Sequence, residues 1–526
     1  MLAKIHSAAL QGLNAILVHV EVDTFDGGQQ PRFTIVGLPD NAVKESQERV
    51  QSALRVNGYK APAKSVVINL SPADVRKEGS GFDLPMALGV MQSYEFLPEG
   101  STNGYMFAGE LGLDGTILPI RGALPIAIMA RSQGYKGLFV PVDNAREAAV
   151  VNNLPVYGVS HLNEVVSFLN GLKPLEPTVV NTREEFYSQQ FSFPFDFDEV
   201  KGQENVKRAF EVAAAGGHNI ILIGSPGCGK SMMAKRLPSI LPPLSLGESL
   251  ETTQIHSIAG KLKKETSLIS QRPFRAPHHT VSDVALVGGG NTFMPGEICL
   301  AHNGVLFLDE LPEFNRSVLE TLRQPLEDRV ITVSRARYNL TLPCSFMLVA
   351  SMNPCPCGYH GDPSHNCACT PGQIQRYMNK ISGPLLDRID LHVEMQAVPF
   401  SQLSKMQPGE PSANIRERVI RARNIQTERF KTLSLEESGG RGRIHCNAQM
   451  TEKMIQQFAQ PDPKSLDVLR MAMERLKLSA RAYSRILKVA RTIADLDASD
   501  TVQSQHIAEA IGYRSLDRGD WAERGV

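Results

Sequence analysis

One stretch decides the fold: residues 219–231 read NIILIGSPGCGKS. The first part, residues 219–223, is a short apolar run that favours a buried strand, and residues 232–237 favour a helix. Between them lies a match to the P-loop pattern, made of Gly224, Ser225, Pro226, Gly227, Cys228, Gly229, Lys230 and Ser231. A P-loop in this context predicts a phosphate-binding turn in a parallel α/β sheet.

The residue types of this turn suit ATP with Mg²⁺. Glycines let backbone N–H groups surround the phosphates, Lys230 can reach the β- and γ-phosphates, and Ser231 can ligate Mg²⁺. A glycine-rich turn without a ligand is the alternative, and the correct strand and helix on either side disfavour it.

A second motif lies downstream, where residues 304–310 read GVLFLDE. This is an apolar strand that ends in two carboxylates. Asp309 is expected to hold Mg²⁺ through water, and Glu310 to polarise the attacking water. Acidic strand ends are common, but one that follows a P-loop favours an ATPase.

Composition limits the class of protein and its cellular location. The 526 residues include 42% hydrophobic and 21% charged residues, with a formal net charge of zero. No apolar run approaches the roughly 18 residues of a membrane span. Eight cysteines are present, and four of them lie between residues 355 and 369, unlike a secreted disulfide framework. We therefore expect a cytoplasmic protein without a membrane partner.

Pattern along the chain divides it into four parts. Residues 1–172 mix expected strands (16–22, 33–36, 65–70, 106–108 and 137–140) with helical patterns such as 41–56 after the N-cap candidate Asp40. Residues 173–194 form a proline-containing linker, and residues 195–397 alternate strands and helices. Residues 398–526 are helical, with apolar spacing at 414–430, 465–478, 480–496 and 502–511.

Three further segments resemble AAA+ ATPases. Residues 346–354 resemble a sensor 1 strand that ends in Asn353, and residues 382–390 resemble the arginine-finger segment of the magnesium-chelatase and MCM branch. Residues 478–485 resemble the sensor 2 helix. The resemblance implies that Asn353 is a sensor, that Arg388 reaches the ATP of a neighbouring subunit, and that Arg481 contacts the γ-phosphate. A finger that acts on a neighbour requires an oligomer, and the family suggests a hexameric ring.

The cysteine cluster has two C-x-C pairs separated by a short loop. A tetrahedral Zn²⁺ site would suit them, with the ligands Cys355, Cys357, Cys367 and Cys369. His360 or His365 could replace a thiol. A redox-inert loop and a redox switch remain as alternatives.

The first domain resembles the Lon protease domain at residues 77–83 and 109–122, but it departs from Lon at the catalytic positions. The only serine of the first segment, Ser80, precedes the expected nucleophile, and residues 123–126 read ALPI where Lon carries its lysine. A Ser–Lys dyad needs both groups. We therefore expect a Lon-like fold without peptidase chemistry.

Residues 327–342 alternate as two short strands around Arg335 and Arg337. They resemble the pre-sensor 1 hairpin of MCM helicases, which implies contacts of both arginines with DNA phosphates in a ring channel. Residues 272–297 resemble the helix 2 insert, another channel element. The last domain is rich in arginine, which is compatible with DNA binding or with an ordinary charged surface.

The order of a Lon-like domain, an AAA+ P-loop parallel-sheet core with a cysteine cluster, and an all-α lid resembles the ComM family of magnesium-chelatase-like proteins. The resemblance covers nearly all of the chain. It implies a homo-hexameric bacterial DNA motor, a helicase or translocase, that acts on single-stranded or branched DNA and promotes branch migration in homologous recombination, as in natural transformation. A metal-chelatase motor subunit and an AAA+ protein-remodelling ATPase are the alternatives.

Overall fold

The computed structural model describes residues 2–26, 28, 30–60, 64–290, 293–335, 338–362, 364–397, 408–431, 433, 444–476 and 478–517. The chain folds into two compact units. The first unit contains Met1–Gln189, Ser245–Ser270 and Gly290–Pro295, and the second contains Gln190–Leu244, Gln271–Gly289 and Gly296–Val526. None of the described helices is both long and apolar enough to cross a membrane.

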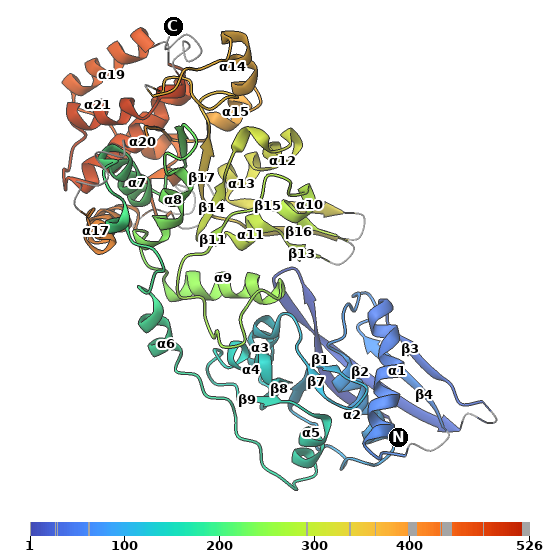
Figure 1. The fold of residues 1–526 in the computed structure, drawn as a ribbon. Coiled ribbons are helices and arrows are strands. Elements are labelled where there is room, and N and C mark those ends of the chain that lie inside the picture. Colours follow the sequence, from blue (N-terminus) through green and yellow to red (C-terminus); the bar gives the residue numbers. More distant parts are fainter. Residues whose placement is uncertain are drawn as a thin grey trace. The chain divides into compact units, whose positions relative to one another are not determined.

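The first unit is built on a seven-stranded mixed sheet (Figure 1). Its β1–β2 and β2–β4 pairs are antiparallel, and its other pairs are parallel. Across the sheet the order is β3 (Phe33–Val36), β4 (Lys64–Ser71), β2 (Asn14–Asp26), β1 (Ala3–Gln11), β5 (Tyr105–Phe107), β8 (Gly137–Pro141) and β9 (Val156–Val159). The five strands expected from the sequence are confirmed, and β1 and β9 are additional.

Helix α1 (Asn41–Val56) has the limits that the sequence predicts. Asp40 is its N-cap, because the carboxylate accepts a hydrogen bond from the backbone N–H of Val43 at 2.8 Å. The buried side chains, which include Val43, Val50 and Leu54, recur at helical spacing along one face. Local capping and apolar periodicity therefore suffice to specify this element.

The Lon-like segment places Ser80 beside a carboxylate. The Ser80 hydroxyl donates a hydrogen bond to Glu110. The stretch where Lon carries its lysine lies in α3 (Ala123–Ser132), in which Leu124 and Ile126 are buried. Ser80 therefore faces an acidic group in this fold.

Helix α9 (Leu246–Ile258) belongs to the first unit, although it follows the P-loop region in sequence and lies within the range 195–397. It packs against α3 (Figure 1), and the backbone N–H of Gly122 donates to the carbonyl of Ser257 at 3.1 Å. Leu250 on this helix packs into the hydrophobic cluster that contains Leu124.

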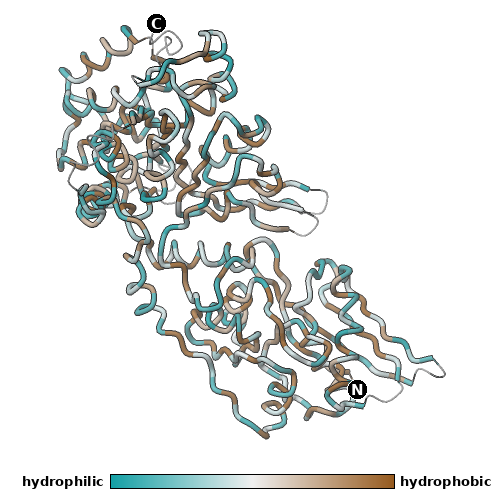
Figure 2. The backbone as a smooth tube through the Cα atoms, viewed as in Figure 1, coloured by the Kyte–Doolittle hydropathy of each residue, from teal (hydrophilic) through white to brown (hydrophobic). Residues whose placement is uncertain are grey.

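The second unit has a five-stranded sheet in which the strand pairs are parallel. The order is β11 (Phe274–Arg275), β14 (Val305–Leu308), β17 (Met347–Met352), β10 (Ile220–Gly224) and β18 (Leu391–Met395). Every residue of β10, β14 and β17 is buried, and these strands are mostly hydrophobic along their length (Figure 2). This pattern is typical of a parallel sheet covered on both faces.

Helices complete the second unit. Helix α7 (Glu204–Gly216) precedes β10, and α8 (Lys230–Arg236) follows the P-loop. From residue 408 onward, the described part of the chain contains helices and no strand: α17 (Ser412–Phe430), α18 (Glu452–Phe458), α19 (Pro463–Leu476), α20 (Ala480–Leu496) and α21 (Ser504–Gly512). The expected α/β class is confirmed. Within the expected linker, a short helix also forms, α6 (Thr182–Gln189).

Several arginines of the last segment have structural partners. Arg418 pairs with Glu211 and Glu410, and Arg423 donates to the carbonyl of Ala214 at 2.7 Å. Arg429 pairs with the fully buried Asp495. These contacts tie α17 to α7 and α20, so Arg418, Arg423 and Arg429 contribute to helix packing.

Candidate nucleotide site

The P-loop joins the end of β10 to the start of α8. Gly227 and Gly229 have φ angles of 80° and 98°, a region that glycine occupies without steric cost. Helix α8 begins at Lys230, so its first backbone N–H groups point back toward the loop. This arrangement is typical of an anion-binding helix N-terminus.

Lys230 and Asn353 are brought together although they are far apart in the sequence. The Lys230 ammonium donates to the carbonyls of Gly224 and Ser225 at 2.7 and 3.1 Å, and to Asn353 Oδ1 at 3.2 Å. Asn353 directly follows β17, which is the parallel neighbour of β10. Parallel strands place their carboxyl ends at one edge of the sheet, which explains why these two side chains meet.

Ser231 and Asp309 also meet, as the sequence motifs require. The Ser231 hydroxyl donates to Asp309 Oδ2 at 2.7 Å. The hydroxyl of Ser351, on β17, donates to the other oxygen of Asp309. A hydroxyl and a carboxylate side by side at the P-loop are the oxygen ligands that Mg²⁺ prefers, so these residues fit the ion.

Glu310 adopts a left-handed backbone conformation, with φ of 54°. Such a conformation is uncommon for residues other than glycine and concentrates at functional sites. Its N–H donates to the Ser351 hydroxyl at 3.3 Å, and its carboxylate is 56% exposed. The carboxylate is therefore free to face a water molecule next to the P-loop.

His279 is a site residue that sequence reasoning did not single out. Its Nδ1 lies 3.7 Å from Glu310 Oε2, and its ring packs edge-on against Phe314. Residue 279 lies in the insert before β14 and Glu310 lies after that strand, so the two residues meet only in the folded chain. No spacing in the sequence signals the contact.

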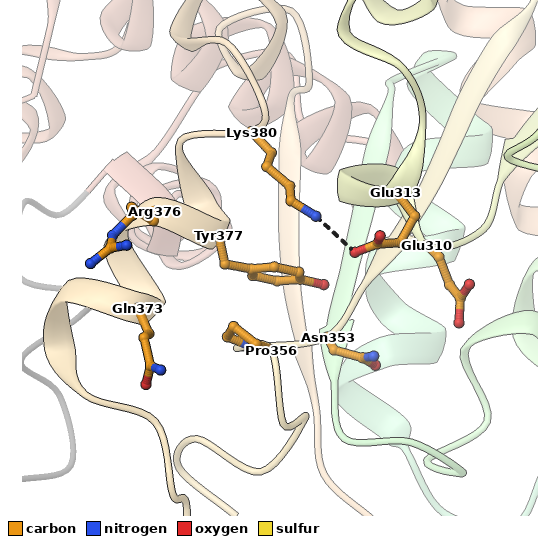
Figure 3. A pocket seen from close by; sticks show the side chains of 8 residues that line it. All are labelled: Glu310, Glu313, Asn353, Pro356, Gln373, Arg376, Tyr377 and Lys380. Atoms are coloured by element: carbon orange, nitrogen blue, oxygen red, sulfur yellow. Dashed lines mark hydrogen bonds and ion pairs between the residues drawn. The ribbon is translucent and has the colours of Figure 1, made fainter.

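A cavity of about 430 Å³ opens beside Glu310 and Asn353 (Figure 3). Lys380 points toward Glu313 and pairs with it at 3.1 Å. The Tyr377 hydroxyl accepts a hydrogen bond from the backbone of Asn353, and burial is the main cause that raises its pKa to about 12. The cavity is lined by Glu310, Glu313, Asn353, Pro356, Gln373, Arg376, Tyr377 and Lys380.

Arg481 contacts the arginine-finger segment through Asp387, the residue that precedes Arg388. One nitrogen of Arg388 donates to the carbonyl of Pro384 at 2.7 Å and another pairs with Glu327, while Nε is buried without a partner. Arg481, whose side chain is 72% exposed, pairs with the adjacent Asp387 at 2.7 Å. Among the described residues, these partners all lie outside the P-loop.

Asp390 fixes the end of the arginine-finger segment. This buried carboxylate contacts His218 at 2.9 Å and Arg485 at 3.1 Å, and His218 contacts Thr492 at 2.8 Å. Burial alone would raise the pKa of Asp390, but Arg485 and His218 hold it below its ordinary value. The network joins the finger segment to α20.

The four clustered cysteines converge on one point. Their sulfurs all lie within 4.8 Å of one another. Cys355 Sγ is 3.3 Å from Cys357 Sγ and 3.7 Å from Cys367 Sγ. A tetrahedral zinc with Zn–S bonds of about 2.3 Å requires sulfurs about 3.8 Å apart, whereas a disulfide requires about 2.05 Å. Four thiols, without His360 or His365, therefore form a group suited to a metal ion.

The expected hairpin is confirmed: β15 (Val330–Arg335) pairs antiparallel with β16 (Tyr338–Pro343). Arg335 is exposed at the end of β15, opposite Tyr338. Arg337 lies outside the described residues. In the neighbouring insert, Arg275 pairs with Glu297 at 2.6 Å.

Three family models match the chain. Residues 196–403 match the magnesium chelatase subunit ChlI, residues 20–144 match the subunit ChlI of Mg-chelatase, and residues 409–514 match the C-terminal part of the same subunit. The chain is also 43% identical to the competence protein ComM of Haemophilus influenzae over 98% of both chains. This protein belongs to the ComM family.

More distant relatives share only parts of this ComM-family chain. The DNA replication licensing factor mcm7 of Schizosaccharomyces pombe is 26% identical over 61% of this chain and 41% of its own. The magnesium-chelatase 38 kDa subunit of Cereibacter sphaeroides is 26% identical over 31% of this chain and 53% of its own. Membership of the magnesium-chelatase-like AAA+ group indicates an ATPase.

Proposed function

We propose that this ComM-family protein is an ATP-hydrolysing, homo-hexameric DNA motor that promotes branch migration in homologous recombination, as in natural transformation. The observation that carries the ATPase part is the convergence of Lys230, Ser231, Asp309 and Asn353 at one edge of the sheet, with Glu310 beside them. Likeness to a competence protein and to a replication licensing factor supports DNA as the substrate.

The chemistry follows from these positions. Lys230 and the loop N–H groups are placed to bind the β- and γ-phosphates. Ser231 and Asp309 would hold Mg²⁺, directly or through water, and the ion would supply positive charge to the phosphate oxygens. Glu310 accepts a proton from the attacking water. Asn353 already accepts a hydrogen bond from Lys230 and orients the γ-phosphate.

The arginine pair supports a ring. Arg388 binds Glu327 and Arg481 binds Asp387, so both arginines have partners outside their own P-loop. We assign both to the ATP of the neighbouring subunit in a homo-hexamer. The eight cysteines are all free, which supports a reducing cytoplasm as the location.

One assay distinguishes a DNA motor from a metal-chelatase motor subunit and from a protein-remodelling ATPase. ATP hydrolysis by the full-length protein is measured alone and with branched DNA, single-stranded DNA, a porphyrin or an unfolded protein. We expect branched or single-stranded DNA to stimulate hydrolysis. Stimulation only by the porphyrin would identify a chelatase motor, and stimulation only by the unfolded protein a remodelling ATPase.

The hairpin makes the DNA assignment testable. Arg335→Ala combined with Arg337→Ala should leave basal ATPase near normal, because the nucleotide site is untouched. DNA stimulation and branch migration should fall sharply, and the slope of log affinity against log salt should flatten, because phosphate contacts release counterions. The control is Lys464→Ala with Arg470→Ala on α19, which removes the same charge elsewhere.

Two results would contradict the role of the hairpin. A double variant that stays hexameric and still migrates branches at the wild-type rate does not use these arginines on DNA. A double variant that elutes as a monomer in size-exclusion chromatography shows that they hold the ring together instead.

We also propose that Cys355, Cys357, Cys367 and Cys369 bind one structural zinc, since their sulfurs have the spacing of a tetrahedral site. Elemental analysis should find close to one zinc per chain. Cys369→Ser should lower both zinc content and thermal stability, because structural zinc contributes directly to folding. Cys299→Ala, a buried cysteine outside the cluster, should keep the zinc. Metal-free wild-type protein that is folded and active would refute the site.

A further inference from the structure

The loop that carries the four thiols lies against the P-loop. The thiols come in two pairs, and the segment between them, residues 358–366, reaches residues 225 and 226. Neither the P-loop motif nor the cysteine spacing implies this contact, because more than a hundred residues separate them in the chain.

Two contacts define it. The carboxylate of Asp362, whose side chain is only 7% exposed, accepts hydrogen bonds from Ser364 within the loop and also from the Ser225 hydroxyl of the P-loop. Gly358 packs on Pro226 so closely that a Cβ at Gly358 would lie 2.7 Å from the Pro226 ring. Gly358 also has a φ of 87°, so both the backbone and the packing require glycine there.

The same loop is tied to the sensor side of the site. Cys355 is two residues beyond Asn353, which accepts the hydrogen bond from Lys230. Pro356 lines the cavity beside Glu310. Thr370, directly after Cys369, begins α14 (Pro371–Met378) with a capping box, and Tyr377 of α14 binds the Asn353 backbone. The thiols therefore lie between the P-loop, sensor 1 and α14.

Regular secondary structure does not order this loop. Its described residues, 353–362 and 364–370, form neither helix nor strand. Segments without regular structure lose much conformational entropy when they are ordered. A metal ion bound by four ligands supplies the cross-links that such a loop needs.

We propose that the metal on the four thiols braces the P-loop through Gly358 and Asp362, so that metal occupancy sets the affinity of the subunit for ATP. The proposal rests on the zinc assignment made above and is independent of the DNA substrate. A braced P-loop is preorganised for the phosphates, and preorganisation lowers the ordering cost of binding. Without the metal, the loop releases residues 225 and 226, and ATP binds more weakly.

The experiment measures zinc content and the Kd for a fluorescent ATP analogue on the full-length protein with Mg²⁺ present. Asp362→Ala should keep one zinc per chain and raise the Kd roughly threefold to tenfold, because it removes the hydrogen bond from Ser225, together with two from Ser364 within the loop, and none of these is made to ATP itself. Cys367→Ser should lose the zinc and raise the Kd by more than about tenfold, because the whole brace is released. Asn366→Ala, an exposed position on the same loop, is the matched control and should change neither quantity.

A reversible version avoids any folding defect of the cysteine variant. Wild-type protein is stripped with a zinc-selective chelator, returned to Mg²⁺ buffer and titrated with the ATP analogue before and after zinc is added back. The Kd should rise on stripping and return on repletion.

The outcomes distinguish the proposed effect of the metal on ATP affinity from the zinc assignment and from the motor function. If wild-type protein holds zinc but Asp362→Ala or zinc-stripped protein binds ATP as tightly as wild type, the brace is wrong and the zinc site stands. Wild-type protein without metal overturns both. A failure of DNA to stimulate hydrolysis refutes the motor function and leaves these binding results unaffected.

Discussion

Glu310→Gln will lower kcat for ATP hydrolysis by roughly 10²–10⁴-fold, the usual contribution of a positioned general base. The Kd for ATP will stay within about twofold of wild type, because the change is isosteric and touches no phosphate-binding group. The structure supports this difference between kcat and Kd. Lys230 binds the carbonyl of Gly224 and Ser231 binds Asp309, so neither depends on Glu310, and the Glu310 side chain is more than half exposed beside the cavity.

Two further variants show whether the loss of turnover is specific to Glu310. Lys230→Ala should weaken ATP binding itself, because the ammonium that reaches the phosphates is lost. Glu313→Gln removes a carboxylate that lines the same cavity but pairs with Lys380, and it should hydrolyse ATP at close to the wild-type rate. Single-turnover hydrolysis and equilibrium binding are the measurements. If Glu310→Gln turns over like wild type while Glu313→Gln is inactive, the general base is Glu313.

Arg388→Ala will lower the ATPase rate of the assembled ring by roughly 10³–10⁵-fold, the range seen when an arginine finger is removed. Within the chain, the guanidinium binds Glu327 and leaves Nε without a partner. The Glu327 side chain is 53% exposed and that of Arg388 is 20% exposed, and Arg388 also donates to the carbonyl of Pro384 at 2.7 Å. Arg388 must therefore leave both partners to reach a neighbouring ATP, where its unpaired Nε would gain one.

Mixed rings distinguish action on a neighbour from action within the subunit. Arg388→Ala subunits added to wild type should depress the ATPase rate per subunit, and an Arg388→Ala subunit should hydrolyse its own ATP only beside a wild-type neighbour. Glu327→Gln, which frees the finger, should remain at least as active as wild type. A hexameric Arg388→Ala protein with an unchanged ATPase rate would remove Arg388 from catalysis.

The parts of this fold that were predictable from the sequence have local causes. Helix α1 follows from Asp40 and the apolar spacing behind it, and β10 and β14 follow from short apolar runs that end in recognisable motifs. The meeting of Lys230, Asn353 and Asp309 was also predictable, because parallel strands bring their carboxyl ends to one edge.

The contacts that were not predictable depend on tertiary packing. No periodicity links His279 to Glu310, Asp362 to Ser225 or Arg481 to Asp387. Composition also cannot distinguish a DNA-binding arginine from one that packs helices, and Arg418 proved to bind Glu211 and Glu410. Helix α6 has a single buried residue, Phe186, so its sequence carries almost no amphipathic signal.

The placement of α9 determines how this protein responds to cleavage. Residues 245–270 return to the first unit after the chain has already entered the second. A protease that cuts within residues 173–194 would thus leave α9, on the carboxyl-terminal piece, still packed on α3 of the amino-terminal piece. The nicked protein should co-purify as one particle under native conditions. An ATPase fragment that begins at residue 190 would lose α3, expose more of Leu250 to water and tend to aggregate.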